Sequence, residues 1–215
     1  MRPHDQPTAL RDATRPIRLG VHGSSHLAAT LVTGAGHDPD RFEFVPYEVT
    51  DPFRELRNGE ADIMIVKYAL REPDIAFSAP VAEDARAVIV GAHHPLAVRH
   101  SVSVEEAARY DAFDRPGDFP PYVWDLVVPR CTPAGTPVRR AHPMTTLEAM
   151  RSILATTDAV HLSFRSLESI VSAGIRVVPV NDLPPAPVAF AWLREPGPSS
   201  HIREFVAAAE ARVRR

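Results

Sequence analysis

The sequence predicts an α/β fold in which helices cover a mainly parallel sheet. Between residues 17 and 66, strand and helix patterns alternate in the order βαβαβ, and this order is typical of right-handed crossovers within a parallel sheet. The third strand, residues 61–66, is a nearly continuous apolar run, as expected of a strand buried on both faces. Residues 59–97 then read as a helix end, a strand, a crossover, another strand and a sharp turn. We expect this segment to carry the chain from one lobe to a second.

In the first half of the chain, apolar periodicity and capping residues define each element. The first helix begins at the turn Gly23-Ser24-Ser25 and ends near Gly34, because serine caps helix N-termini and glycine follows their ends. The second helix begins at Asp51-Pro52, a good N-cap and first-turn pair, and ends at Gly59. The expected strands of this half are residues 16–22, 42–49, 61–66 and 85–90.

In the second half, two capping boxes predict helix starts. They are Ser103 with Glu106 and the run Thr145-Thr146-Leu147-Glu148, whose helix extends to about residue 155. Further helices are expected at 166–173 and from Ser200 to the C-terminus, and strands at 159–162, 175–180 and 188–193. Residues 113–137 include six prolines, and this stretch gives no clear element.

Composition and charge exclude several classes of protein. A chain of 215 residues, 45% apolar and 24% charged, is long enough for one domain or two small lobes. The formal net charge of −3 offers no basic surface for nucleic acid. The single cysteine, Cys131, cannot form an internal disulfide, and this fits a reducing, cytoplasmic location. No apolar run approaches the ~18 residues needed to span a membrane, and residues 1–15 lack the apolar core of a signal peptide.

Several sequence landmarks then occur in a recognisable order over nearly the whole chain. They are Ile17-Arg18-Leu19-Gly20, Leu56-Arg57-Asn58-Gly59-Glu60-Ala61-Asp62, Ala79-Pro80-Val81-Ala82-Glu83-Asp84, His94-Pro95-Leu96-Ala97 and Pro187-Val188-Ala189-Phe190-Ala191-Trp192 before a final amphipathic helix. In this order they resemble the effector-binding domain of LysR-type transcriptional regulators, from residue 17 to about residue 213.

The resemblance implies a type 2 periplasmic-binding-protein fold: two Rossmann-like α/β lobes joined by two crossing strands, with a small ligand in the cleft. We expect a flexible tail at residues 1–15, lobe I at 16–90 and 188–215, and lobe II at 91–187. The chain departs from the family in two ways. No helix-turn-helix DNA-binding module precedes the first strand, and Thr157-Asp158-Ala159 stands where the family tends to have a Gly-x-Gly turn.

Candidate ligand-binding residues lie at strand ends and helix starts, where unpaired backbone N–H groups favour anions. By resemblance, Ser24 matches a hydroxyl that faces the effector, although a plain N-cap explains it equally well; Ser25 and Thr50 have comparable positions. Lys67 follows a buried strand, so it could pair with a carboxylate or form a Schiff base, or could be exposed. Its neighbour Tyr68 could line the mouth of the cleft.

Three histidines form a second candidate group. His22 and His26 lie four residues apart, and His161 can approach them from the other lobe. A zinc site is not favoured, because His22 ends a strand instead of sharing the helix of His26. Hydrogen bonding to a ligand, acid/base chemistry and structural burial remain the alternatives.

The strand end Phe113-Asp114-Arg115-Pro116 faces the cleft by resemblance. Arg115 could bind an acidic ligand with two hydrogen bonds and Asp114 could accept one, or the two could form a salt bridge with each other. Phe113 is a further candidate ligand contact. Tyr122 and Trp124 could form aromatic walls of the cleft or could pack within the loop.

These observations support three functional hypotheses, none of which needs a cofactor or a metal. The first is a cytoplasmic domain that binds an anionic or aromatic metabolite. The second is the same fold recruited as an enzyme of secondary metabolism, with His22, His26 and Asp114 as acid/base residues. The third is an interaction protein, because LysR effector domains pair side by side; it would form a homodimer, or a heterodimer with a related regulator. Direct binding to nucleic acid or to a membrane is not expected.

Overall fold

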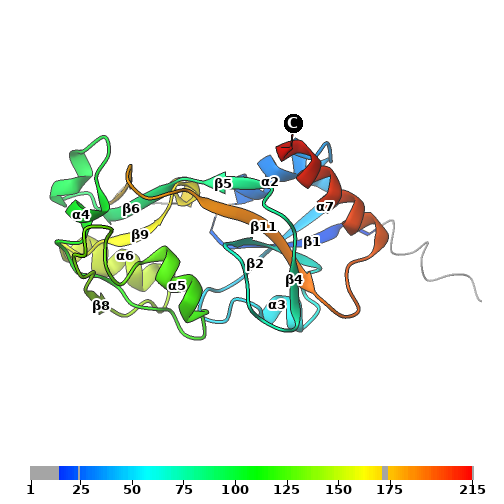
Figure 1. Cartoon of the computed structure of the whole chain (residues 1–215), viewed down its shortest axis with the longest axis horizontal. Helices are drawn as coiled ribbons and strands as arrows, with labels where there is room; N and C mark the ends of the chain where they lie inside the picture. The colour runs from blue at the N-terminus through cyan, green and yellow to red at the C-terminus, as the bar shows by residue number, and fades with distance from the viewer. Residues whose placement is uncertain (1–14, 24, 171–173, 215) are drawn as a thin grey trace, which may run out of the picture.

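The computed structural model describes residues 15–23, 25–170 and 174–214 of the chain. These residues form two α/β lobes that lie side by side (Figure 1). We call the lobe that contains both ends of the described chain lobe I and the other lobe II. Extended segments join the lobes: β5 (Ala82–Asp84) leads directly into β6 (Arg86–Gly91), and the segment after β10 (Ile175–Pro179) leads back into β11 (Ala186–Leu193).

Lobe I contains a mixed sheet in the order β2-β1-β3-β11-β4, with β5 also paired to β11. The further strands are β1 (Ile17–Val21), β2 (Phe42–Pro46), β3 (Ile63–Lys67) and β4 (Ile75–Phe77). β1 pairs in parallel with β2 and β3, whereas β11 is antiparallel to its neighbours. The βαβαβ order of the sequence therefore produces the parallel part of this sheet.

The helices of lobe I pack on the sheet through apolar side chains. α2 (Ser25–Gly34) buries Leu31 and Val32, and α7 (Ser200–Val213) buries Ile202, Phe205 and Val206. The ring of Phe205 lies between two strands, with its centroid 4.9 Å from that of Phe42 and 4.9 Å from that of Phe190. The short helices are α3 (Arg54–Arg57) and the 3-10 turn η1 (Pro39–Arg41).

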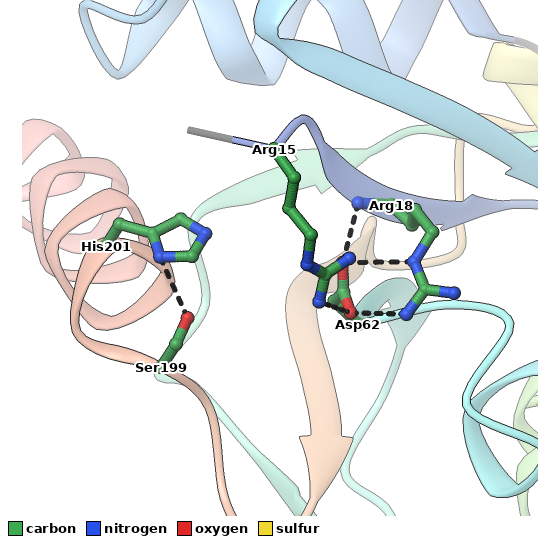
Figure 2. Close-up of polar contacts among 5 residues, drawn as sticks. All are labelled: Arg15, Arg18, Asp62, Ser199 and His201. Atoms are coloured by element: carbon green, nitrogen blue, oxygen red, sulfur yellow. Dashed lines mark hydrogen bonds and ion pairs between the residues drawn. The ribbon is translucent and has the colours of Figure 1, made fainter. Parts of the chain in front are cut away.

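An ion-pair cluster fixes the start of β1 (Figure 2). The half-buried Asp62, just before β3, accepts hydrogen bonds from the guanidinium groups of Arg15 and Arg18 and from the backbone N–H of Arg18 at 2.8–3.4 Å. Burial alone would raise the pKa of Asp62, but the hydrogen bonds from Arg18 and Arg15 hold it below its ordinary value. Beside this cluster, Ser199 contacts the ring of His201 at the start of α7, 3.0 Å from Nδ1.

Lobe II is built on a smaller antiparallel sheet in the order β10-β6-β9, where β9 is His161–Phe164. A second pair consists of β7 (Ala112–Phe113) and β8 (Arg140–His142). The helices are α4 (Val104–Ala107), α5 (Pro121–Val127) and α6 (Leu147–Thr156), with 3-10 turns η2 (Pro95–Val98) and η3 (Arg165–Ile170). Both sides of the Ser103–Glu106 capping box are formed, and Thr146 caps α6.

Some elements differ from the sequence-based prediction. Asp51-Pro52 does not open a helix, because residues 49–53 form turns and α3 begins only at Arg54, without a side-chain cap. α5 lies within the proline-rich stretch that gave no prediction. The helix expected at 166–173 is a 3-10 turn as far as residue 170, and residues 171–173 lie outside the described part. In the described ranges, no helix is long and apolar enough to cross a membrane.

Candidate ligand-binding cleft

A cavity of about 110 Å³ lies between the two lobes. Lobe I contributes two strand ends and the loop after β2, and lobe II contributes α5, α6, β9 and the adjoining loops. The lining residues are His22, Glu48, Val49, Lys67, Phe119, Val123, Trp124, Val127, Met144, Thr146, Leu147, Met150, His161, Ser163, Phe164 and Leu167. Most of these side chains are apolar, so the cavity suits a compact, largely apolar molecule that makes a few polar contacts.

The parallel strands of lobe I place two of the polar groups. His22 directly follows β1, and Lys67 is the last residue of β3, its neighbour in the sheet. Both strands run in the same direction, so both side chains arrive at the same carboxyl-terminal edge, where α/β folds bind ligands. The next residue, Tyr68, has a φ of 68°, a left-handed conformation that turns the chain sharply out of β3.

Helix α5 of lobe II forms hydrogen bonds with lobe I. The hydroxyl of Tyr122 donates to the carboxylate of Glu72 and accepts from the backbone N–H of Arg71, both at 2.6 Å. Just before α5, the N–H of Asp118 donates to the carbonyl of Thr50 at 2.7 Å. These bonds join segments of the two lobes, so the lobes are closed on each other around the cavity.

Arg86 holds the C-terminal end of α5. Its guanidinium is almost fully buried and donates to the carbonyls of Leu126 at 3.0 Å and of Val127, as well as to the hydroxyl of Tyr68 at 2.9 Å. The last carbonyls of a helix lack intrahelical partners and carry partial negative charge, so a cation stabilises them. Arg86 thereby positions the cavity-lining face of α5.

The charged side chains beside the cavity interact mainly with other protein groups. The ammonium of Lys67 lies 3.3 Å from Asp84 Oδ2 and 4.4 Å from the ring centroid of Phe164. Burial lowers the pKa of Lys67, and the attraction of Asp84 only partly offsets that effect. Two cations thus lie near one buried carboxylate: Lys67 in the lining of the cavity and Arg86 outside it, with Asp84 paired to Lys67. Glu48, which also lines the cavity, is exposed.

The two cleft histidines are neutral at pH 7. Burial lowers the pKa of His22 to about 4, and its Nδ1 lies 3.3 Å from the carbonyl oxygen of Tyr47. Burial also lowers the pKa of His161 to about 3, and the nearby His22 and Arg86 disfavour its cationic form further. Neutral imidazoles can donate or accept a hydrogen bond, according to the tautomer.

Two buried nitrogen atoms on residues that line this cavity have no hydrogen-bond partner among the described residues. They are Nε1 of Trp124 and Nδ1 of His161, on side chains that are each only 4% exposed. The two rings are nearly parallel, with an interplanar angle of 22° and 6.2 Å between their centroids. Buried polar groups are normally paired, so these two atoms are the places beside the cavity where the described chain leaves a hydrogen bond unmade.

The structure brings three of the predicted site residues together: His22, Lys67 and His161 all line the cavity. Thr50 and Tyr68 lie at the junction of the lobes instead. The carbonyl of Thr50 accepts from Asp118, and the hydroxyl of Tyr68 lies 3.4 Å from the carbonyl of Leu126. Neither side chain is among those that line the cavity.

The candidates at the start of α2 are not part of this cavity. Ser24 lies outside the described residues. Ser25 and His26 are exposed and do not line the cavity, and the carbonyl of His26 accepts from the hydroxyl of Thr30 within the helix. His26 therefore lies outside the cavity that His22 lines. This is expected, because His22 follows a strand whereas His26 lies within a helix.

The candidates that follow β7 also lie elsewhere. Phe113 is fully buried and packs edge-on against His161, with 5.5 Å between the ring centroids. Asp114 accepts from the backbone N–H of Arg115 at 2.7 Å, and Arg115 itself donates to the carbonyls of Gly117 and Phe119. Both charged side chains line a separate, open pocket of about 320 Å³ on lobe II.

Sequence reasoning missed much of the apolar wall. Val123, Trp124 and Val127 are buried along one face of α5, and their spacing is the i, i+1, i+4 pattern of a helix face. That signal is present in the sequence, but it is short and follows two prolines. Trp124 is the member of this face that the sequence does indicate, as a candidate aromatic wall of the cleft. Among the described residues, no group of histidine, cysteine and carboxylate side chains could hold a metal ion.

Comparisons with known proteins agree on one family. The family model for the LysR substrate binding domain matches residues 14–214. The effector-binding domain of QuiR in complex with shikimate is 21% identical, with 90% of this chain and 94% of that chain covered and a TM-score of 0.62. The BenM effector-binding domain with benzoate is 16% identical, covering 92% and 91%, with a TM-score of 0.60.

A longer relative, an OxyR mutant from Corynebacterium glutamicum, is 12% identical with a TM-score of 0.64. The match covers 93% of this chain and 64% of that one, so the chain spans less than two thirds of this relative. At these identities the likeness to solved structures shows a shared fold. A search of curated proteins found no match.

Proposed function

The chain belongs to the family of LysR substrate-binding domains, whose type 2 periplasmic-binding-protein fold it shares, and on this premise we propose that it binds a small, ring-containing organic anion between its lobes. The observation that carries the proposal is the mainly apolar cavity between the lobes, with His22, Lys67 and His161 in its wall. Related domains are described with shikimate and with benzoate.

The size of the cavity supports a compact ligand. Its volume is about 110 Å³, on the order of nine water-sized spheres at roughly 12 Å³ each. A single ring with one or two small substituents occupies this much space. The rings of Phe119, Trp124 and Phe164 and the side chains of Met144 and Met150 give such a ring an apolar surface to contact.

The charges favour an anion over a cation. Beside the cavity, Lys67 is paired with the carboxylate of Asp84. The buried guanidinium of Arg86 donates to neutral groups, the carbonyls of Leu126 and Val127 and the hydroxyl of Tyr68, so among the described residues one buried positive charge has no carboxylate as its counter-charge. An anionic group in the cavity would supply it, whereas a bound cation would add to the repulsion. Because His22 and His161 are neutral at pH 7, they do not change this balance.

Thermal unfolding in the presence of candidate ligands tests the proposal. A ligand that binds only the native protein stabilises it by about 2.7 kcal/mol at a hundredfold excess over its Kd. We expect monocyclic carboxylates to raise the Tm and the matching amines to leave it unchanged. Equal shifts with acids and amines, or none with either, would contradict the proposal.

A cavity-filling variant with a matched control locates the binding site. Leu147 lines the cavity mouth and is 36% exposed, whereas Leu126 is 49% exposed and does not line the cavity. Leu147→Trp should therefore abolish the ligand-induced rise in Tm, and Leu126→Trp should preserve it. The reverse result would place the ligand outside the cleft.

The other two hypotheses have specific tests of their own. Acid/base chemistry in the same cleft rests on His22 and His161, because His26 and Asp114 lie outside the cavity; mass spectrometry would show whether a bound compound is consumed. An interaction protein would form a homodimer or pair with a related regulator. Light scattering after size exclusion would give the mass of the assembly.

A further inference from the structure

The two unpartnered nitrogens of the cavity restrict what the ligand can be. An indole N–H is a donor and has no acceptor capacity, so only a hydrogen-bond acceptor can satisfy Trp124 Nε1. A buried donor gives up its hydrogen bonds to water on folding. If it gains no other partner, the protein loses about 1–3 kcal/mol of stability. Trp124 is 4% exposed and its Nε1 has no partner in the described chain, so an acceptor on a bound molecule would recover this energy.

His161 extends the same polar site. Its Nδ1 is likewise buried and unpartnered, and its ring faces that of Trp124 with 6.2 Å between centroids. In a neutral imidazole the single proton can sit on Nδ1, so each of the two rings can present a buried N–H donor. Two donors from adjacent rings match the two oxygens of a carboxylate.

We propose that Trp124 Nε1–H and His161 Nδ1–H together bind the carboxylate of the ligand, with the ring of the ligand against the apolar wall. This inference rests on the proposed function and assigns its specificity-determining residues. Lys67 is then not the direct partner of the carboxylate, because its ammonium is paired with Asp84. The excess positive charge near the cavity is then that of Arg86, which acts on the ligand at longer range.

The tryptophans make this assignment directly observable. Trp124 and Trp192 are the only two in the chain, and Trp192 lies on β11 in lobe I, outside the cavity lining. In a Trp192→Phe protein, the single indole N–H resonance in a ¹H–¹⁵N spectrum belongs to Trp124. Titration with benzoate should move this resonance downfield, whereas toluene, which has the ring without an acceptor, should not.

Affinity measurements provide the second readout. Hydrogen bonds to a charged group are worth ~1.5–3 kcal/mol, so Trp124→Phe should weaken benzoate binding by about tenfold or more. Trp192→Phe is the matched control and should bind as the wild type does. Without ligand, Trp124→Phe should lose only the stability that a smaller buried ring costs, because no hydrogen bond within the described chain is removed.

His161 is tested by a pair of substitutions. His161→Leu should lose benzoate affinity, and His161→Asn, whose amide can place an N–H near the position of Nδ1, should restore part of it. Toluene affinity should be the same in Trp124→Phe as in the wild type, and the same in His161→Asn as in His161→Leu. If benzoate binds the wild type and Trp124→Phe equally, the inference is wrong and the proposed function stands. If no carboxylate binds the wild type, the proposed function is wrong as well.

Discussion

Acidification from about pH 7 to about pH 5 should destabilise this protein through its two cleft histidines. An unfolded histidine has a pKa of 6.5, but burial lowers the pKa of His22 to about 4 and that of His161 to about 3 in the folded chain. Between these values the unfolded chain binds more protons than the native one. The free energy of unfolding therefore falls as the pH falls from about 6.5 to about 4, and His161 continues to contribute until about pH 3.

The size of the effect follows from the two pKa values of each histidine. By proton linkage, each of the two groups removes about 2 kcal/mol on going from about pH 7 to about pH 5. The wild type should thus lose about 4 kcal/mol from this pair. Burial also lowers the pKa of His94, so His94 adds to the loss in the wild type and in every variant of the pair alike.

Urea unfolding of the wild type and of His161→Leu at the two pH values measures the contribution. The variant keeps an apolar cavity wall and removes one titrating group, so its loss of stability on acidification should be smaller by about 2 kcal/mol. His22→Gln should give a similar reduction. If His161→Leu loses as much stability as the wild type, then His161 is protonated in the folded chain at about pH 5, and the assignment of a neutral cleft histidine is refuted.

Three further substitutions test other parts of the structure. Tyr122→Phe removes the hydroxyl that joins α5 to lobe I and should increase the radius of gyration in small-angle scattering of the unliganded protein, whereas an unchanged radius would argue against an interlobe bond. Gly117→Ala should also open the lobes, because a Cβ there would lie 2.5 Å from the carbonyl oxygen of Thr50. Gly135→Ala is the control: its backbone is also left-handed, but its Cβ would meet nothing within 4 Å, so the radius of gyration should not change. Asp62→Asn should lower the urea midpoint by an amount equivalent to about 2 kcal/mol at pH 7, since the arginine hydrogen bonds lose their charged acceptor; that difference should disappear as the pH falls through the depressed pKa of Asp62.

The elements that sequence reasoning predicted well are those that local interactions determine. The parallel strands of lobe I needed only the alternation of apolar runs and capping residues, and the capping box at Ser103 is complete within one helical turn. α5 was missed because its stability is not local. It has only seven residues and no side-chain N-cap, and its C-terminal carbonyls are bound by Arg86 from a distant strand.

The same distinction explains the candidate site. Lys67 could be predicted because it follows a buried strand, and His22 because it belongs to a group of histidines and ends a strand; in the structure the ends of β1 and β3 lie at one edge. The unpaired state of Trp124 Nε1 could not be read from sequence, because it depends on the packing of α5 against α6 and β9. Whether Lys67 was exposed or paired was likewise open in the sequence, and its partner Asp84 comes from the crossing strand β5.

Helix α5 links ligand recognition to lobe closure, because it contacts the cavity and lobe I at the same time. Val123, Trp124 and Val127 line the cavity, while Tyr122 on the same helix binds the loop of lobe I that contains Glu72. A ligand that contacts Trp124 therefore favours the closed arrangement by the difference between its affinities for the closed and open states. By linkage, loss of the Tyr122 bond should weaken all cleft ligands by the same factor, since none of them touches it. Loss of the Trp124 N–H should instead weaken only ligands that carry an acceptor, so the two substitutions separate closure from recognition.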